Sequence, residues 1–353
     1  MSIYNFNMKR FVQEKDVQGL DPAFFIACSR VRGTGKTYST VGFLLDFIKK
    51  NPGRKFGLFC RTKAMLGGLA EGMFKSYMGD KMPGWSIYEV IKMKGLYSDI
   101  YIETGDGDEK EKLHIGYVLP LNSASGIKNV SSTFVDIDWM FFDEFLPEFG
   151  NEYLSNEIEK FDKIMGSISR GGGKISRYVP VIFCSNTVSM FNPYFDAFGL
   201  LGKLQEDSKR YKGPGLVFQM IENVALAKKH LDTPYARAMA RVGGNDYTGD
   251  VWFKNNNSGI EKPDNWGDGI YKFTLYKDGK AYAVRWYSIV EKCFIDSKNV
   301  DNGFRLKFRY DNNNLELPSL KESYLFDWLR ARLSRGQVRF SDYVARSIFY
   351  DEI

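Results

Sequence analysis

Residues 24–38, FFIACSRVRGTGKTY, constrain the fold more than any other stretch of the chain. Phe24, Phe25 and Ile26 are typical of a short buried strand, and the glycine-rich segment after them is typical of a turn that opens into a helix. A phosphate-binding loop requires this order, because its backbone N–H groups and the start of the helix bind phosphate oxygens. We therefore expect ATP to contact the loop residues Arg32, Gly33, Thr34, Gly35, Lys36 and Thr37.

Two side chains of this loop have specific expected roles. Lys36 should reach the β- and γ-phosphates, and the Thr37 hydroxyl should ligate Mg²⁺. The consensus GxxxxGK[ST] has glycine six positions before the lysine, where this chain has Arg30. The alternative interpretation is a glycine-rich turn with an unrelated lysine, which the order of strand, loop and helix disfavours.

A second motif lies at residues 134–144, FVDIDWMFFDE. Residues 139–142 are all bulky and predict a strand buried on both faces of a parallel sheet. At the end of this strand, Asp143 is expected to hold Mg²⁺, partly through water, and Glu144 to orient and deprotonate the attacking water. Asp136 and Asp138 precede the buried part of the strand and are not expected in the site.

Other polar residues also follow predicted strands. The segment YVPVIFCS predicts a strand that delivers Asn186 to the edge where Asp143 lies. There Asn186 would donate to the γ-phosphate or bind the attacking water, although it could also serve as a turn residue that satisfies backbone groups. Arg61 and Lys63 follow the strand predicted at 56–60 and are expected to contact nucleotide or a polyanion, with a solvated loop as the alternative.

The length of 353 residues predicts two domains. The longest apolar runs have the length of strands and the N-terminus lacks a signal-peptide apolar region, so we expect a cytoplasmic protein without a membrane span. The four cysteines form no CxxC pair and are predicted to be reduced and buried. The chain contains only two histidines, so we do not expect a histidine metal site or histidine-based catalysis.

The net charge of +6 permits a polyanionic partner without demonstrating one. Near the C-terminus, however, arginines are concentrated, and there we expect contact with nucleic acid, with a solvated helix face as the alternative. These residues are Arg330, Arg332, Arg335, Arg339 and Arg346.

The pattern changes after about residue 200. Residues 205–250 are polar and helix-prone, which predicts a helical linker. The following region predicts a β-hairpin at 270–276 and 281–287 around Asp278-Gly279. Further strands are expected at 289–295 and 304–310, a helix from a capping box at Ser319 to about Gly336, and a last helix over 341–350.

With these motifs, the chain resembles the genome-packaging ATPases of phi29-like bacteriophages. The resemblance rests on RGTGKTY, FFDEF, CSNTVSMFNPYF and VRFSDYVARSIFY. It implies an α/β fold with an N-terminal P-loop ATPase domain of the additional-strand, RecA/FtsK-like type over 1–204. It also implies a helical linker over 205–250 and, over 251–353, an α+β RNase H-like domain that has lost nuclease function.

The resemblance also implies a function. Such ATPases form a homopentameric ring on the portal of an empty procapsid in the host cytoplasm and translocate double-stranded DNA into it. Arg170 matches the arginine finger that reaches the ATP of a neighbouring subunit, and Lys128 matches a basic residue that acts in trans. Lys174 and Arg177 are competitors for the role of the finger.

The C-terminal domain is expected to bind DNA, or a structural RNA at the procapsid, and not to cut. A nuclease of this type needs several carboxylates around two metals, and the strands IYKFTLY and AYAVRWY contain none. Two other functions stay open at this stage. One is a terminase- or helicase-like ATPase with an active C-terminal nuclease, and the other is a nucleotide-gated assembly factor without motor activity.

Overall fold

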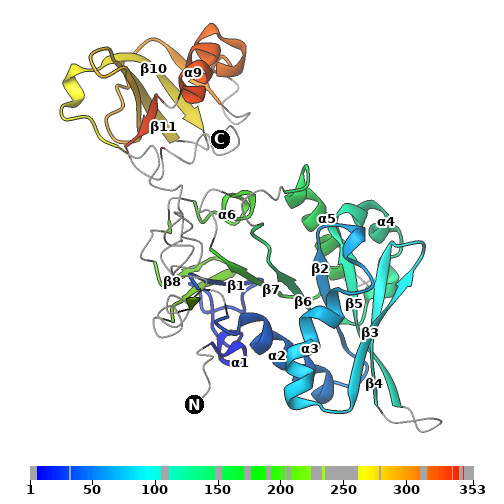
Figure 1. The fold of residues 1–353 in the computed structure, drawn as a ribbon. Coiled ribbons are helices and arrows are strands. Elements are labelled where there is room, and N and C mark those ends of the chain that lie inside the picture. Colours follow the sequence, from blue (N-terminus) through cyan, green and yellow to red (C-terminus); the bar gives the residue numbers. More distant parts are fainter. Residues whose placement is uncertain are drawn as a thin grey trace. The chain divides into compact units, whose positions relative to one another are not determined.

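The computed structural model describes residues 6–31, 33–104, 111–147, 153–170, 176–187, 192–201, 203–204, 208–223, 233–234, 261–277, 280–310, 316–335, 337–341 and 345. The chain forms two compact units (Figure 1). The N-terminal unit comprises Met1–Val188 and Asp207–Trp252, and the C-terminal unit comprises Ser189–Glu206 and Phe253–Ile353. None of the helices in these described parts combines the length and the apolar character needed to span a bilayer.

A nine-stranded sheet forms the centre of the N-terminal unit, with the strand order β3-β4-β5-β2-β6-β7-β1-β9-β8. Strands β5, β2, β6, β7, β1 and β9 are parallel, so their carboxyl ends meet at one edge, which we call the carboxyl edge. The strands are β1 Phe24–Ser29, β2 Lys55–Cys60, β3 Trp85–Lys92, β4 Tyr97–Thr104, β5 Glu111–Pro120, β6 Ile137–Asp143, β7 Val181–Asn186, β8 Arg210–Gly213 and β9 Leu216–Ile221.

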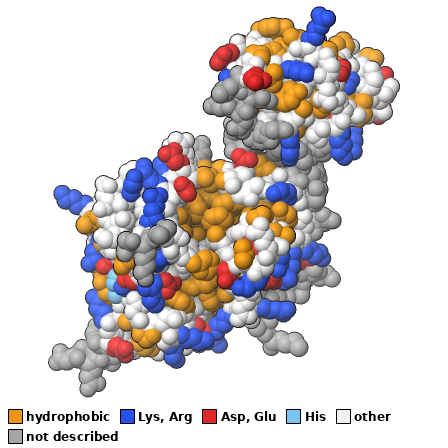
Figure 2. Space-filling view, turned by 180° about the vertical axis from the view of Figure 1, so that it is seen from behind, with side chains coloured by type: hydrophobic (Ala, Val, Ile, Leu, Met, Phe, Trp, Pro, Cys, Tyr) orange, Lys and Arg blue, Asp and Glu red, His pale blue; other side chains and the backbone are white. Residues whose placement is uncertain are grey.

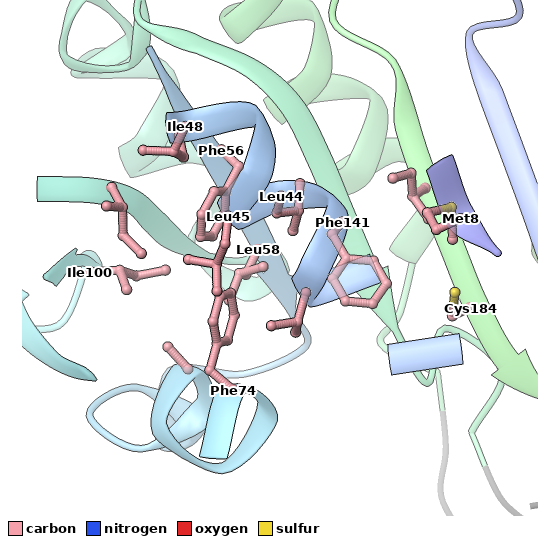
Figure 3. Close-up of a cluster of buried hydrophobic side chains, with 14 of the residues drawn as sticks. Met8, Leu44, Leu45, Ile48, Phe56, Leu58, Phe74, Ile100, Phe141 and Cys184 are labelled. Carbon is pink, nitrogen blue, oxygen red and sulfur yellow. The ribbon is translucent and has the colours of Figure 1, made fainter. Parts of the chain in front are cut away.

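Helices cover both faces of this sheet because its central strands are apolar on both sides. On one face, α2 and α3 bury a large apolar cluster that includes Leu44, and part of it is shown in Figure 3. In this cluster, the ring of Phe74 stacks on that of Phe56 in β2. On the other face, Phe161 of α5 packs against Phe24 and Phe183. The helices of this unit are α1 Met8–Phe11, α2 Lys36–Lys50, α3 Leu69–Lys81, α4 Ala124–Asn129 and α5 Glu157–Ser169, with short 3₁₀ turns at Lys63–Met65, Leu121–Ser123 and Ser131–Phe134.

The C-terminal unit has its own five-stranded sheet, in the order β13-β10-β11-β12-β14. Leu325 and Leu329 of α9 contribute to an apolar core with Phe273 and Leu275 of the sheet. Its elements are α6 Pro193–Ala197, β10 Ile270–Lys277, β11 Lys280–Tyr287, β12 Lys292–Asp296, β13 Lys307–Arg309, α9 Tyr324–Ser334 and β14 Val338–Phe340, with 3₁₀ turns at Trp266–Asp268 and Leu320–Glu322. The expected hairpin at 270–287 is confirmed by the antiparallel pairing of β10 and β11.

The sequence-based prediction was wrong in several places. Residues 210–221, expected in a helical linker, form β8 and β9, and β9 pairs with β1. Residues 85–92, for which no strand was predicted, form the edge strand β3, whose burial is only partial. The helix in the C-terminal unit is capped by the side chain of Ser323, which accepts from the Leu325 N–H, and not by Ser319.

The second sheet also contains parallel strand pairs that were not predicted. β13 pairs in parallel with β10 at the opposite side from β12, and β14, which was not predicted, pairs in parallel with β12. Most of the last predicted helix and the turn Asp278-Gly279 lie outside the described residues.

Candidate active site

The phosphate loop joins β1 to α2 at the carboxyl edge, as predicted. Gly33 and Gly35 have φ angles of 76° and 84°, the left-handed region that a residue without a Cβ adopts at least cost. Gly35 is the N-cap of α2, so the unpaired N–H groups of the first helical turn are available to an anion. Arg32 lies outside the described residues.

The ammonium group of Lys36 links the ends of two strands. Lys36 is buried, and its Nζ donates to Asn186 Oδ1 at 3.0 Å and to Ser29 Oγ. The Ser29 hydroxyl lies 3.3 Å from Asn186 Oδ1 and 2.9 Å from the carbonyl oxygen of Val31. The structure therefore brings Lys36 and Asn186 together as predicted. It adds Ser29, which the sequence marked only by its position at the end of β1.

Thr37 and Asp143 are the second pair that the fold joins. Thr37 Oγ1 donates to Asp143 Oδ2 at 2.6 Å across 106 positions of sequence. A hydroxyl beside a carboxylate is the oxygen donor set that suits Mg²⁺, so these two residues fit the expected metal. The loop also fits a phosphate group, because Thr34 Oγ1 is buried without a hydrogen-bond partner among the described residues.

The electrostatics of Asp143 reflect its place beside the loop. Burial raises its pKa, while the hydrogen bond from Thr37, the charge of Lys36 and the N–H of Glu144 all act in the opposite direction. A carboxyl group with a raised pKa gains from a nearby cation, because the cation stabilises the ionised form. This arrangement favours the binding of a divalent ion with the nucleotide.

Glu144 follows directly and is exposed, which is compatible with its predicted contact with water. Its φ of 52° is left-handed, and its N–H donates to Asp143 Oδ1 at 3.2 Å. A non-glycine residue with such a φ is uncommon and persists only where the surrounding structure enforces it.

Arg61 helps to hold the backbone of Glu144 in this conformation, a role that was not predicted from the sequence. Its guanidinium donates to the carbonyl oxygens of Glu144, at 3.0 Å, and of Phe145. It also pairs with the buried carboxylate of Glu157 at 3.2 Å, and the rings of Phe142 and Tyr153 flank it. Arg61 is therefore occupied within the protein, so the structure does not support its predicted contact with nucleic acid, whereas Lys63 is exposed.

Two candidates for the arginine finger, Arg170 and Arg177, lie at the edge opposite Asp143. Arg177 donates to the carbonyls of Val135 and Ile137 at the start of β6, and lies 3.7 Å from Asp138. This occupied guanidinium argues against Arg177 as a finger. Arg170 is exposed at the end of α5.

Four other residues of the N-terminal unit were considered in the sequence analysis, two as candidates for action in trans and two as acids outside the site. Lys128 is exposed at the end of α4, and Lys174 lies outside the described residues. Asp136 and Asp138, which were not expected in the site, pair with Lys55 and Arg54 at the edge away from the loop.

Among the five arginines predicted to contact nucleic acid in the C-terminal unit, Arg332 and Arg339 are half-buried and have internal partners. The Arg332 guanidinium lies over Trp328 at 4.0 Å and Trp286 at 4.6 Å. Arg339 Nε donates to Glu261 at 2.9 Å, where Lys292 also binds. Arg330 and Arg335 are exposed and Arg346 lies outside the described residues, so the prediction is weakened for Arg332 and Arg339.

The parallel sheet, the phosphate loop and the acid pair at the end of β6 define the class of P-loop ATPases. Within this class, the chain belongs to the Podovirus DNA encapsidation protein (Gp16) family, whose sequence profile matches residues 23–353.

Individual relatives cover most of the chain. The DNA packaging protein of Bacillus phage phi29 is 24% identical over 333 residues, 91% of this chain and 90% of that protein. The corresponding protein of Bacillus phage B103 is 22% identical over 339 residues, 91% and 93% of the two chains.

Two solved structures share the fold over nearly the whole length. A chain of the bacteriophage phi-29 viral genome packaging motor assembly has a TM-score of 0.62 and 20% identity, covering 99% of this chain and 98% of its own. A chain of the Phi-28 gp11 DNA packaging motor has a TM-score of 0.60 and 18% identity, covering 98% and 97%.

Proposed function

We propose that this chain, a phage DNA-packaging motor ATPase by its family, hydrolyses Mg-ATP at the β1–α2 loop and uses the energy to translocate double-stranded DNA into a procapsid. The observation that carries the proposal is the hydrogen bond of 2.6 Å between Thr37 and Asp143. This contact joins the loop that binds phosphate to the strand end that carries the acids, and nucleotide hydrolysis needs both.

Each residue of the site has a role that its surroundings support. Lys36 would exchange its contacts with Ser29 and Asn186 for the β- and γ-phosphates when ATP binds. Thr37 and Asp143 would hold Mg²⁺, which neutralises charge that develops on the phosphates. Glu144 would orient and deprotonate the attacking water, and Asn186 would hydrogen-bond the γ-phosphate or that water.

We propose further that Arg170 completes the site of a neighbouring subunit in a ring. Helix α5 starts beside Arg61 at the carboxyl edge, and its 13 residues span about 20 Å. At its far end, the Ser169 carbonyl accepts from the N–H of Arg177, which is anchored at the start of β6. Arg170 is thus too far from its own Glu144, and this distance supports the proposal that Arg170 acts in trans. We propose that Lys128 also acts in trans.

The assembly and its partners follow the same proposal. The similar solved chains come from packaging motors, which supports a homopentameric ring at the portal of a procapsid in the host cytoplasm. Double-stranded DNA would be the substrate, and a structural RNA a further candidate partner. The C-terminal unit would be an RNase H-like domain that binds nucleic acid through residues such as Arg335.

We also propose that this unit does not cut DNA. In β12, the buried Asp296 accepts hydrogen bonds from the backbone and side chain of Asn299. Within the described ranges, no cluster of three or more acidic, histidine or cysteine residues could hold a metal ion. A carboxylate engaged by an asparagine and lacking such neighbours is a poor nuclease ligand.

The test is steady-state ATPase activity with and without double-stranded DNA. We expect DNA to stimulate the wild type and Glu144→Gln to lower turnover by about 10² to 10⁴-fold, the usual contribution of a general base. Glu159→Gln, which removes an exposed carboxylate from α5, is the matched control and should behave as wild type.

A mixing series tests the ring. Arg170→Ala should lose roughly 10³ or more in stimulated turnover, and its mixtures with wild type should lose activity more steeply than simple dilution. Absence of stimulation by DNA, together with a fully active Arg170→Ala, would instead support a nucleotide-gated assembly factor. Metal-dependent cleavage of plasmid would show an active nuclease.

A further inference from the structure

The buried end of β1 carries a polar group that the roles assigned so far do not use. On the face drawn in Figure 2, basic and acidic side chains lie beside each other at many places, so surface charge does not identify a further site. Ser29, the last residue of β1, is fully buried and lies beside Asn186, its partner in β7. Its hydroxyl contacts three polar groups, which are the Lys36 ammonium, Asn186 Oδ1 and the Val31 carbonyl.

The orientation of the Asn186 amide depends on the donor that faces its oxygen. Lys36 Nζ lies 3.0 Å from Asn186 Oδ1, and an ammonium group has donors only, so the amide atom that faces it is the carbonyl oxygen. The NH₂ group of Asn186 makes no hydrogen bond within the described residues. This group is the donor that Asn186 would offer to the γ-phosphate in the proposed function.

The amide needs a different donor once Lys36 binds ATP. In the proposed function, Lys36 exchanges Asn186 for the β- and γ-phosphates. An amide whose oxygen has lost its donor can turn over and present that oxygen, instead of the NH₂ group, to the phosphate. The Ser29 hydroxyl lies 3.3 Å from Asn186 Oδ1 and is in position to replace the lysine.

The Ser29 hydroxyl has one proton, so it donates fully to one acceptor at a time. The Val31 carbonyl lies at 2.9 Å and Asn186 Oδ1 at 3.3 Å, so the carbonyl takes the proton while Lys36 supplies Asn186. Rotation about the Cβ–Oγ bond redirects the proton to Asn186 without moving a heavy atom. A phosphate on the Asn186 NH₂ group favours this rotation, because successive hydrogen bonds in a chain polarise and strengthen one another.

We propose that Ser29 is a positioning residue of the ATPase site, whose hydroxyl donates to Asn186 Oδ1 when Lys36 binds the phosphates. Ser29 then holds the Asn186 NH₂ group toward the γ-phosphate or the attacking water without touching either. The inference rests on the proposed function, because it requires ATP at the β1–α2 loop.

Steady-state ATPase kinetics of the full-length chain with double-stranded DNA test the proposal. Ser29→Ala should lower kcat by about 5- to 10-fold, because one hydrogen bond of the network is lost. The KM for ATP should change by less than about 3-fold, since Lys36 and Thr37 still bind the nucleotide. Ser98→Ala is the matched control and should behave as wild type, because it removes a buried hydroxyl of β4 that has no hydrogen-bond partner in the described part of the chain.

Two other replacements of Ser29 separate hydrogen bonding from side-chain size. Ser29→Thr keeps the hydroxyl and should restore most of kcat. Ser29→Cys keeps a side chain of similar size that donates weakly, so it should resemble Ser29→Ala. A raised KM for Ser29→Ala, with Ser29→Thr no better and Ser29→Cys fully active, is the pattern of a packing defect and would overturn the proposal.

A double-mutant cycle shows whether Ser29 acts through Asn186. Asn186→Ala should lower kcat by about 10²-fold, the usual effect of removing a donor aimed at developing charge. Adding Ser29→Ala should then lower kcat by less than about 2-fold more. An equal effect of Ser29→Ala in both backgrounds, or a wild-type kcat for Asn186→Ala, would also overturn the proposal. A wild-type chain that does not hydrolyse ATP would instead show that the proposed function itself fails.

Discussion

Replacement of Arg61 by alanine separates the role that the structure gives this residue from the role that its sequence suggested. The guanidinium is the ionic partner of Glu157, which is only 3% exposed, and it donates to the carbonyls of Glu144 and Phe145. Removing one member of a buried ion pair costs about 3–5 kcal/mol, because the other charge stays buried.

In this variant Glu157 would still accept the hydrogen bond from the N–H of Leu154 at 2.8 Å. We therefore expect the lower part of the range, about 3 kcal/mol, which corresponds to a fall of about 6–12 °C in the melting temperature. Arg61→Lys should recover part of this loss, since an ammonium group can approach Glu157 but cannot also bind both carbonyls.

Thermal and denaturant unfolding of the full chain measure this effect. In a double-mutant cycle with Glu157→Gln, the two changes should be less than additive by at least about 1 kcal/mol. Lys63→Ala is the nearby control and should change stability by no more than about 0.5 kcal/mol. A loss below about 1 kcal/mol for Arg61→Ala, combined with a reduced salt dependence of DNA binding, would refute the structural role and restore the nucleic-acid role.

Two further predictions concern ion pairs away from the phosphate loop. Arg177→Ala should lower the free energy of unfolding by about 1–3 kcal/mol, because the carbonyls of Val135 and Ile137 lose the donor that Arg177 supplies. In ATPase assays, mixtures of Arg177→Ala with wild type should not show the steep loss of activity that is expected for Arg170→Ala. Glu261 is hydrogen-bonded by Lys292 and Arg339, which lower its pKa from the usual 4.5, so its contribution to stability is complete above about pH 4.5 and is lost as pH falls through the lowered value. Melting curves of wild type and Glu261→Gln should therefore differ at neutral pH and converge in acid.

The central part of the fold could be predicted because its strands are apolar runs and its turns contain glycine, and both are visible in the sequence. Buried parallel strands such as β1, β2, β6 and β7 are continuous apolar segments, and each ends near a polar residue. The edge strands could not be predicted in the same way. β3 and β8 are half-buried and contain polar residues, and their pairing depends on neighbours distant in sequence.

The site shows the same division. Lys36, Thr37, Asp143 and Asn186 were predictable because each follows a strand end or a glycine turn, and parallel strands place such ends together. The function of Arg61 was not predictable, because its partner Glu157 lies 96 positions away on a helix. In the sequence, a basic residue at the end of a strand indicates a ligand-binding crevice. Only the structure shows whether that residue is already paired with an acid of the same chain.

Helix α5 connects these observations. Its first residue, Glu157, binds the arginine that holds the backbone of Glu144, and the carbonyl of Ser169 accepts from the N–H of Arg177 at the opposite edge of the sheet. A helix fixed at both ends does not bend its terminus back over about 20 Å. This distance between Arg170 and its own Glu144 supports the proposal that Arg170 acts on the active site of a neighbouring subunit.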